Sequence, residues 1–428
     1  MENFDAIVVG AGPAGCAAAY TMAKAGLNIL VLERGKYAGA KNMWGGALFG
    51  SAMNEVFPEF WKEAPVERSV SRHAISFLTK DASLSIDFKN AHRDSSSCPG
   101  FIILRAKFDQ WLAGQVEKAG AIIASGLEVD DFIREGQAIR GVKVAGEEFP
   151  ANLVILADGA NSLLAAKTGL RGEFKAQDLK QGVKEVLRLP REVIEDRFNL
   201  KGTDGAVMEF VGHCTLGLPG GGFIYTNLDS LSVGVVVQLS ALLEKRLKAS
   251  DLIEGFKAHP FIQNLIRGGE LLEYSAHLIP VSGVSMMPRL YGDGIMITGD
   301  AAAMVLGTGL ILEGANFAVA AGVAAGNAAI RAREKKDYSP AVLQSYEQAL
   351  KDTFVIKDLN TFREAPHFLE NRRIYNDYPE WACDLMSRIF CSDGKPRKNT
   401  FQVVRESMKG RFTVMQLLSD FLRARRAM

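Results

Sequence analysis

The stretch Asp5-Ala6-Ile7-Val8-Val9-Gly10-Ala11-Gly12-Pro13-Ala14-Gly15, close to the N-terminus, decides the fold. Its continuous apolar run over 5–9 is typical of a strand buried on both faces of a parallel sheet. The Ala-rich segment 14–25 predicts a helix that ends at Gly26, and residues 28–32 predict a second strand. The first 35 residues therefore predict a strand–turn–helix–strand unit.

The turn inside this unit has the GxGxxG spacing of dinucleotide-binding folds. Gly10 allows the tight turn, Gly12 lets a pyrophosphate approach the backbone, and Gly15 lets the helix and strand pack closely. The free N–H groups at the helix start then point at the phosphates. Glu33 ends the second strand, where its carboxylate can accept hydrogen bonds from a ribose. The sequence thus predicts a dinucleotide site, and this fingerprint alone leaves FAD and NAD open.

Further strands of the same sheet are expected far along the chain. Apolar runs at 153–157 and 295–298 have the length of buried strands, and they end at Asp158-Gly159 and Gly299-Asp300. The second is followed by an Ala-rich segment, 301–330, which we expect to be a long helix. The nucleotide-binding fold is therefore predicted to be built from discontinuous pieces.

The remaining sequence has a different texture. Runs at 129–134 and 138–144 predict a hairpin, and 175–280 alternates β-type runs with glycine-rich turns, which predicts an inserted antiparallel sheet. After Pro340, helical patterns dominate. The predicted fold class is α/β (α+β), with a Rossmann-type nucleotide-binding domain of residues 1–70, 101–172 and 281–335, an antiparallel-sheet domain of 71–100 and 173–280, and a helical C-terminal region of 336–428.

Composition narrows the classes of function. Lys and Arg total 50 and Asp and Glu 49 among 428 residues, and this balance argues against a nucleic-acid binder. Five scattered cysteines without a CxxC pair provide neither a disulfide framework nor ligands for zinc or an iron–sulfur cluster, so no metal ligand is predicted. We expect a reducing, cytoplasmic compartment. No basic region precedes the first strand, and polar residues interrupt 301–330, so neither a secretory signal nor a spanning helix is expected.

Three spaced motifs carry a resemblance to a known superfamily. The segments 10–15, 158–162 and 299–302, in this order, resemble the FAD-dependent geranylgeranyl-reductase and aromatic-hydroxylase superfamily. The resemblance implies FAD as the cofactor. It also implies that Asp300 binds the ribityl chain of the flavin and that the following helix directs its N-terminus at the flavin.

The same resemblance assigns further residues. Arg105 matches the family's helix-start arginine near FAD, and Val129 matches the position whose backbone meets the adenine. Trp44 is either a packing aromatic or part of a loop over the flavin edge. Together, fingerprint and resemblance predict these cofactor-binding residues: Gly10, Gly12, Pro13, Ala14, Gly15, Glu33, Arg34, Trp44, Gly45, Arg105, Val129, Asp158, Gly159, Gly299, Asp300 and Gly309.

Narrower segments are similar to the FixC-type relatives of electron-transfer-flavoprotein:quinone oxidoreductase, and this likeness covers essentially the whole chain. The segments are 41–46, 220–227, 307–316 and 378–381. The likeness implies an FAD subunit that passes electrons from the alpha and beta subunits of an electron-transfer flavoprotein to a quinone. Single-chain relatives end in an iron–sulfur module, which this sequence lacks. It therefore resembles the subtype of electron bifurcation complex whose cluster sits in a separate ferredoxin-like subunit.

Other interpretations stay open at this point. A stand-alone FAD-dependent reductase of geranylgeranyl (isoprenoid) lipids shares the fold and the fingerprint, and a scaffold that binds FAD only structurally is a third reading. No Ser-His-Asp or HExxH arrangement is present, so no catalytic residue is predicted, because a flavin carries the redox chemistry itself. Phe223 and Tyr225 either line a quinone-like apolar pocket or belong to a strand core.

The C-terminal tail offers a similar choice. Residues 411–426 place Phe412, Met415, Leu418 and Leu422 on one helical face and end in a cluster of arginines, at 423, 425 and 426. Such a basic amphipathic helix lies at a membrane, here the cytoplasmic face, or docks onto the protein's own body or a partner.

Overall fold

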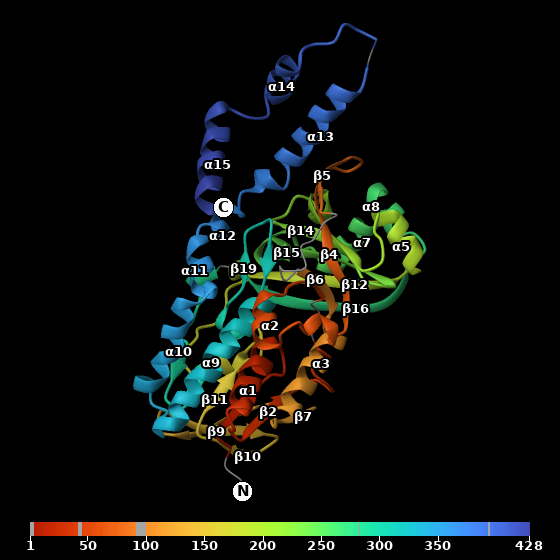
Figure 1. The fold of residues 1–428 in the computed structure, drawn as a ribbon. Helices are drawn as coiled ribbons and strands as arrows, with labels where there is room; N and C mark the ends of the chain where they lie inside the picture. The colour runs from red at the N-terminus through yellow and green to blue at the C-terminus, as the bar shows by residue number, and fades with distance from the viewer. Residues whose placement is uncertain (1–3, 42–44, 91–99, 282, 393) are drawn as a thin grey trace. The chain divides into compact units, whose positions relative to one another are not determined.

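The computed structural model describes residues 4–41, 45–90, 100–281, 283–392 and 394–428. By its internal contacts the chain divides into two units, whose elements are labelled in Figure 1. The nucleotide-binding unit comprises Met1–Val66, Cys98–Asp178 and Leu278–Arg363, and the sheet-and-helix unit comprises Glu67–Ser97, Leu179–His277 and Glu364–Met428. Each unit is thus assembled from three separate chain segments.

The nucleotide-binding unit is built on a six-stranded sheet with the order β17-β18-β11-β1-β2-β7. All neighbours are parallel except the edge pair of β17 and β18. The strands are β1 (Ala6–Val9), β2 (Ile29–Glu33), β7 (Ile122–Ser125), β11 (Val154–Leu156), β17 (Tyr291–Gly292) and β18 (Ile295–Ile297). The four apolar runs expected to form this sheet are all present in it, and β1, β11 and β18 are buried throughout, as for strands covered on both faces.

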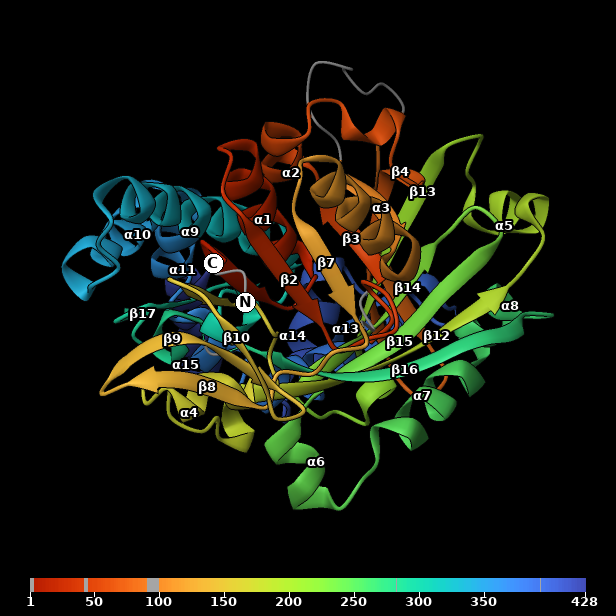
Figure 2. The same cartoon turned by 90° about the horizontal axis from the view of Figure 1, so that it is seen from below.

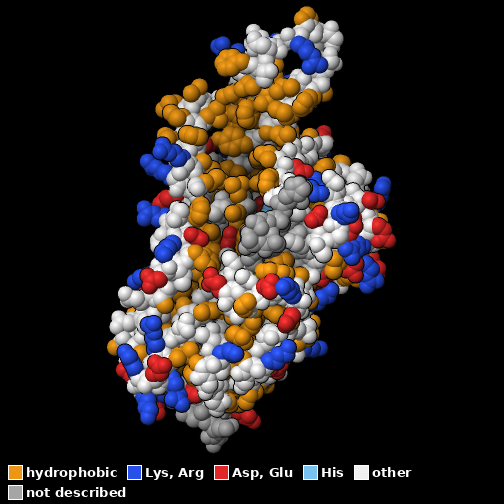
Figure 3. Space-filling model, in the orientation of Figure 1, with side chains coloured by type: hydrophobic (Ala, Val, Ile, Leu, Met, Phe, Trp, Pro, Cys, Tyr) orange, Lys and Arg blue, Asp and Glu red, His pale blue; other side chains and the backbone are white. Residues whose placement is uncertain are grey.

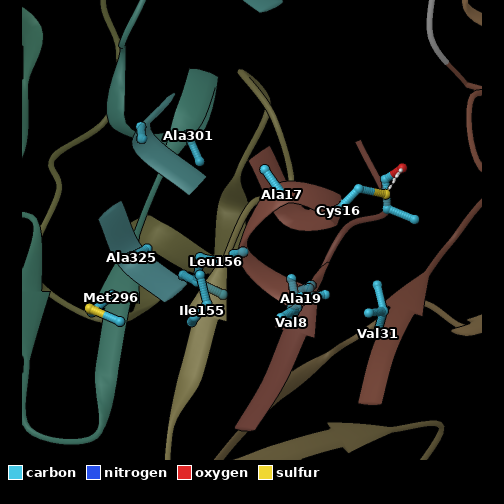
Figure 4. Packing of buried hydrophobic residues seen from close by; sticks show 14 of the residues in the cluster. Val8, Cys16, Ala17, Ala19, Val31, Ile155, Leu156, Met296, Ala301 and Ala325 are labelled. Atoms are coloured by element: carbon cyan, nitrogen blue, oxygen red, sulfur yellow. Dashed lines mark hydrogen bonds between the residues drawn. The ribbon is translucent and has the colours of Figure 1, made fainter. Parts of the chain in front are cut away.

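Helices α1 (Pro13–Lys24) and α9 (Ala315–Lys335) pack side by side in this unit, as Figures 1 and 2 both show. Their approach is close because the contact is made of small residues. A Cβ on Gly322 would lie 2.2 Å from the carbonyl oxygen of Ala14. The alanines of both helices and the strand residues form one core, of which Figure 4 shows Ala17, Ala325 and Ile155.

One local prediction in this unit is wrong. The long helix was expected to follow Asp300 directly, but it begins only at Ala315. The short 3-10 helix η5 (Gly299–Ala302) and a two-stranded hairpin, β19 (Leu306–Gly307) and β20 (Leu312–Glu313), come first. The hairpin forms because Thr308 accepts hydrogen bonds from two backbone N–H groups of the turn with its hydroxyl oxygen, which competes with helix formation.

The expected hairpin at 129–144 is confirmed as β8 (Asp131–Glu135) and β9 (Ala138–Val144), joined by β10 (Glu147–Pro150). Strands β3 (Gly45–Phe49) and β6 (Gly100–Leu104) form another antiparallel pair. The remaining helices of the unit are α2 (Ser51–Val56), α3 (Arg105–Lys118), α4 (Leu163–Lys167), α10 (Pro340–Asp352) and α11 (Phe354–Thr361). Helix α10 packs beside α9, so residues 336–363 group with the nucleotide-binding unit, unlike in the division expected from the sequence.

The sheet-and-helix unit contains a larger sheet with the order β16-β12-β15-β14-β13-β4, and β5 pairs with β4. Strand β15 pairs antiparallel with β12 and β14, as do β13 with β14 and β4 with β5, as expected, whereas β13 and β4 are parallel. The strands are β4 (Val66–Leu78), β5 (Ser83–Lys89), β12 (Leu179–Arg188), β13 (Asp204–Gly212), β14 (Gly220–Thr226), β15 (Ser230–Gln238) and β16 (Glu270–Pro280). Four helices accompany the sheet: α5 (Arg191–Phe198), α6 (Leu239–Lys245), α7 (Ala249–Ala258) and α8 (Pro260–Ile266).

The C-terminal part of this unit is helical. It contains α12 (Ala365–Phe368), α13 (Asp377–Phe390), α14 (Thr400–Met408) and α15 (Val414–Ala427). Both α14 and α15 begin with a capping box, at Asn399 and Thr413, so the sequence itself specifies where each helix starts. Among the described residues, no helix is both long and apolar enough to cross a membrane.

Candidate functional site

Two of the three glycines in the GxGxxG turn are required by the packing of the chain itself. Gly10 has φ +103°, and a Cβ there would lie 2.5 Å from the carbonyl oxygen of Ala157. A Cβ on Gly15 would lie 1.9 Å from the carbonyl oxygen of Gly10. These clashes explain Gly10 and Gly15 without any ligand.

Gly12 is different. The nearest atom to a Cβ built on Gly12 is Nη2 of Arg105, 3.8 Å away, so the chain itself leaves room for a side chain at this position. The glycine instead keeps open a space beside the backbone. That space is where the pyrophosphate of a dinucleotide approaches in folds of this kind.

The first turn of α1 faces this space with uncompensated backbone N–H groups. Gly12 is the N-cap, no side chain caps the helix, and its first turn contains no acidic residue. Pro13 occupies the first position of the helix, and the backbone N–H of Cys16 already bonds to Gly12. The N–H groups of Ala14 and Gly15 are thus left for an anion, which the helix dipole also attracts.

Glu33 fastens the turn to the second strand. Its Oε2 accepts a hydrogen bond from the N–H of Ala11 at 2.9 Å, and its Oε1 accepts one from Gly35 at 2.6 Å. A carboxylate has about four acceptor positions, so both oxygens can still accept from a ribose hydroxyl. The backbone N–H of Leu127 donates a hydrogen bond to the carbonyl oxygen of Glu33. This bond holds the segment that contains buried Val129 near the end of β2. Val129 therefore lies two residues along the chain from a backbone hydrogen bond to Glu33.

Arg105 and Asp300 form the second half of the site. Arg105, the first residue of α3, donates two hydrogen bonds to Asp109, at 2.5 and 2.6 Å, which fix its guanidinium. Burial raises the pKa of Asp300, and the charge of Arg105 partly offsets that rise. Within the described chain the Asp300 carboxyl makes no hydrogen bond, so this half-buried acceptor is left for a ligand.

Gly299 explains how Asp300 reaches the phosphate turn. It has φ +65°, and a Cβ there would lie 2.8 Å from the Cβ of Ala14 at the start of α1. The 3-10 helix η5 therefore rests directly on the start of α1. The predicted residues Gly12, Ala14, Arg105, Gly299 and Asp300 are thereby brought together from three distant chain segments.

Asp158 is another half-buried carboxyl of the site. Its Oδ1 is buried and has no hydrogen-bond partner among the described residues. Burial raises the pKa of Asp158 to about 6, against the opposing effects of Ser162 and of the charges of Arg171 and Arg34. Gly159 follows with φ +81°, a turn conformation that favours glycine. Arg34 is thus close enough for its charge to act on the Asp158 carboxyl.

Arg171 was not predicted. Its guanidinium donates hydrogen bonds to the carbonyl oxygens of Ser162 and Ala301, the latter at 3.0 Å, and its ring neighbour is Phe174, 4.0 Å from the guanidinium carbon. It therefore joins the Asp158 segment to the Asp300 segment. No motif marks this arginine, because its partners are backbone carbonyls that only the fold brings within reach.

The remaining predicted residues lie at the edges of the site or beyond the described chain. Gly45 opens β3 opposite Leu104, next to Arg105. Gly309, with φ +90°, forms the turn between β19 and β20, and Gly314 after this hairpin would place a Cβ 3.8 Å from Oδ1 of Asp300. Trp44 lies outside the described residues.

The arrangement fits a flavin dinucleotide. It offers free N–H groups for the pyrophosphate, a carboxylate for a ribose, an Asp300 carboxyl without a hydrogen bond, and an unsatisfied Oδ1 on Asp158 among the described residues. The described cysteines, at positions 16, 214, 383 and 391, are free thiols. In the described part of the chain, no cluster of histidine, cysteine or acidic residues could hold a metal ion.

The sequence is similar to known families and proteins over its whole length. Residues 5–211 match the FAD dependent oxidoreductase family, and residues 365–428 match the ETF-QO/FixC family C-terminal domain. The chain is 41% identical over 427 residues to the probable electron transfer flavoprotein-quinone oxidoreductase YdiS of Escherichia coli, covering 100% of this chain and 99% of that protein. It is 36% identical to the protein FixC of Azotobacter vinelandii, with 100% and 99% covered.

A solved structure shares the fold. The geranylgeranyl bacteriochlorophyll reductase-like protein of Thermoplasma acidophilum superposes with a TM-score of 0.73 at 21% identity, over 98% of this chain and 99% of that one. At this identity the likeness is one of architecture.

Proposed function

Because this chain belongs to the ETF-QO/FixC family and is an FAD-dependent oxidoreductase of electron transfer, we propose that it carries electrons from an electron-transfer flavoprotein to a quinone, together with a separate ferredoxin-like iron–sulfur subunit. The observation that supports this most strongly is the whole-length similarity to a relative named for that reaction. The partner subunits, the quinone and the use of the complex in electron bifurcation are part of this proposal.

Bound FAD supplies the redox chemistry, taking up and releasing electrons at its flavin ring. The chain's own residues hold the cofactor. The start of α1 at Gly12 binds the pyrophosphate, Glu33 binds the adenosine ribose, and Asp300 binds the ribityl chain. Asp109 keeps the Arg105 guanidinium in place beside this chain.

The C-terminal helices suggest where the protein works. On α15, an apolar stripe points outward: Val414, Met415, Leu418, Phe421 and Leu422 are all exposed, Met415 by 75%. Phe390 of α13 and Phe401 of α14 are exposed as well. Figure 3 shows hydrophobic side chains gathered in the region of these C-terminal helices. A patch of this kind on a water-soluble surface marks an interaction site.

The side of α15 that faces the protein contains Asp420 and Ala427, the two buried residues of this helix. Asp420 is buried, and its carboxylate accepts hydrogen bonds from Arg373 at 2.6 and 2.7 Å and from the Tyr378 hydroxyl at 2.5 Å. Arg423 and Arg425 add positive charge near the C-terminus. We propose that this outward apolar face, with its arginines, rests peripherally on an anionic membrane, which is where a lipid-soluble quinone resides.

Electron transfer is tested with the purified FAD-loaded chain. Photoreduced protein is mixed anaerobically with a short-chain quinone, and flavin re-oxidation is followed by absorbance; the reverse half-reaction uses a reduced electron-transfer flavoprotein as donor. Re-oxidation by the quinone and reduction by the flavoprotein are expected. Reduction by NAD(P)H alone, with saturation of a geranylgeranyl lipid, would instead identify the stand-alone reductase.

Membrane contact is tested by sedimentation with vesicles of phosphatidylcholine containing phosphatidylglycerol. Leu418→Glu/Phe421→Glu should abolish co-sedimentation, because two charges enter the apolar face. The matched control is Leu243→Glu, an exposed leucine on α6. Equal binding by wild type and the double variant would contradict the proposed membrane face.

A further inference from the structure

The two faces of the large sheet in the sheet-and-helix unit differ in character. One face carries Phe210, Ile224 and Val235, which are buried in a core with Phe256 of α7. Since side chains alternate along a strand, the intervening residues point to the other face. There Glu209, Phe223 and Tyr225 are only half-buried.

The second face presents a flat apolar surface. The rings of Phe223 and Tyr225 stack, with centroids 4.8 Å apart and planes 19° from parallel. Phe223 pairs with Gly234 of β15, and a Cβ on Gly234 would lie 2.3 Å from the tip of that ring. The glycine therefore lets the Phe223 ring lie down on the sheet. The result is an aromatic platform, the Phe223–Tyr225 platform, suited to a planar apolar ring.

One carboxyl stands beside this platform. Glu209 pairs with Phe223 across β13 and β14, so both side chains lie on the same face. In the described chain it makes no hydrogen bond or ion pair. Burial alone raises the pKa of Glu209 to about 7, and the pKa of Tyr225 is raised by burial and by Glu209. A half-buried carboxyl without a partner is costly, and such groups cluster at functional sites.

Other charged groups on this face are farther along the sheet or already paired. Lys184 of β12 forms an ion pair with Glu273 at 3.5 Å. Burial lowers the pKa of Lys180, at the far end of β12, to about 8. His73 of β4 pairs with Val207, one alternate position from Glu209. None of these groups is among the causes that raise the pKa of Glu209.

We propose that Glu209 is a catalytic residue that donates a proton to a quinone bound on the Phe223–Tyr225 platform. This inference rests on the proposed quinone reduction and names the residue that serves it. A protonated carboxyl suits this role because it carries no charge beside an apolar ring and is still acidic enough to donate its proton.

A quinone becomes a quinol when it gains two electrons, provided by the flavin chemistry, and two protons. The O–H bond of the Glu209 carboxyl breaks as the O–H bond at one quinone oxygen forms, and water then returns a proton to the carboxylate. The proton for the second oxygen comes from solvent, directly or through a second cycle of the same carboxyl.

The experiment compares wild type with Glu209→Gln and Glu209→Asp as full-length, FAD-loaded proteins. Photoreduced protein is mixed with a short-chain quinone or with ferricenium, an acceptor that takes one electron and no proton. Glu209→Gln should slow the reaction with quinone about 100-fold at pH 6, as expected for loss of a general acid. Its reaction with ferricenium should match wild type. Glu270→Gln, a carboxyl of the same sheet in an exposed ion pair, is the matched control.

A pH profile and a spectroscopic titration separate catalysis from a structural role. Wild-type quinone reduction should fall as the pH rises through about 7, because the acid form is lost; Glu209→Asp should keep a pH-dependent profile, and Glu209→Gln should lack it. Infrared difference spectra should show a carboxylic acid titrating near pH 7 in wild type and not in Glu209→Gln. Wild-type rates and profile in Glu209→Gln would overturn the role of Glu209. A wild type that reduces ferricenium but no quinone would contradict the proposed function itself.

Discussion

Helices α1 and α15 are of similar length, but α1 buries its apolar residues and α15 exposes most of its own. Helix α1 buries nine of its residues, mostly alanines, against α9 and the sheet. Helix α15 buries only Asp420 and Ala427 and leaves its leucines and Phe421 exposed. The first helix is held by apolar contact and the second by an acid and its partners. An apolar stripe along a helix therefore need not face the core, and the buried residues show which side of the helix does.

A substitution at Gly15 should disrupt the contact between α1 and the sheet most strongly. Gly15→Val should prevent folding of the nucleotide-binding unit, because even its Cβ would lie 1.9 Å from the backbone oxygen of Gly10. The measurement is the yield of soluble protein and its thermal unfolding by circular dichroism. Gly114→Ala in α3, where no atom lies within 4 Å of the new Cβ, is the matched control and should be at least as stable as wild type. A cooperative, wild-type-like melt of Gly15→Val would refute this account.

Gly12→Val should separate cofactor binding from folding. The fold should persist, because a Cβ at Gly12 meets no atom closer than 3.8 Å, but the added methyl groups would occupy the space of the pyrophosphate. FAD titration of the apo-protein should show no binding, with circular dichroism as the control for folding. If this variant bound FAD with wild-type affinity, the turn would be structural only.

Asp300→Ala should weaken FAD binding rather than abolish it. Losing a hydrogen bond to a charged group costs about 1.5–3 kcal/mol, or roughly a ten- to hundredfold loss in affinity. The unit should stay folded, since the Asp300 carboxyl makes no hydrogen bond within the described chain. FAD titration provides the affinity and the visible spectrum reports the flavin environment. An unchanged affinity would remove Asp300 from the site.

The polar attachment of α15 should depend on pH. The hydrogen bonds from Arg373, above all, lower the pKa of Asp420 from 3.8 to about 2. A lowered pKa stabilises the folded state above pH 4, and this stabilisation, about 2 kcal/mol, is lost as the pH falls from about 4 to 2. Hydrogen exchange of α15 amides should show it as faster opening at low pH. Asp420→Asn should open faster at neutral pH and lose this pH dependence; persistence of the dependence would assign it to another acid.

The smallest effect is expected on the outer face of α15. Leu418→Ala should change the free energy of unfolding by less than about 0.5 kcal/mol, because Leu418 is exposed and makes no core contact. The reference is Met22→Ala in α1, a fully buried position at which about 2–5 kcal/mol should be lost. Urea unfolding measures both. Comparable losses would mean that the two helices are held in the same way after all.

The sequence predicts those features that depend on neighbouring residues. The strand–turn–helix unit at Gly10–Gly15 and the hairpin around Gly136 were both predictable, because glycine placement and apolar runs encode them locally. The hairpin before α9 was missed, since its alanine-rich surroundings favour a helix and only Thr308 opposes it. The prediction followed the alanine-rich composition of the segment and missed the turn, which is marked in the sequence by Thr308 alone.

Features that depend on distant residues were less accessible. Arg171 binds backbone carbonyls of two remote segments, and nothing in its own sequence context indicates them. Glu209 looks like an ordinary solvent-facing residue of an alternating strand until the pairing with Phe223 is known. The amphipathic pattern of the last helix was visible, but whether its apolar side faced inward depended on Arg373, in another helix segment.

The pairing of α1 with α9 also determines when the nucleotide-binding unit can mature during synthesis. Helix α1 ends at Lys24, and the helix it packs against begins only at Ala315. At about 5–20 residues per second, a ribosome needs roughly 15 to 60 seconds to make the intervening chain. Throughout that interval the surface of α1 that packs against α9 lacks this partner, although β1, β2 and α3, which also contact α1, are made well before α9. A fragment released before residue 315 therefore lacks α9 and cannot complete the packing of this unit.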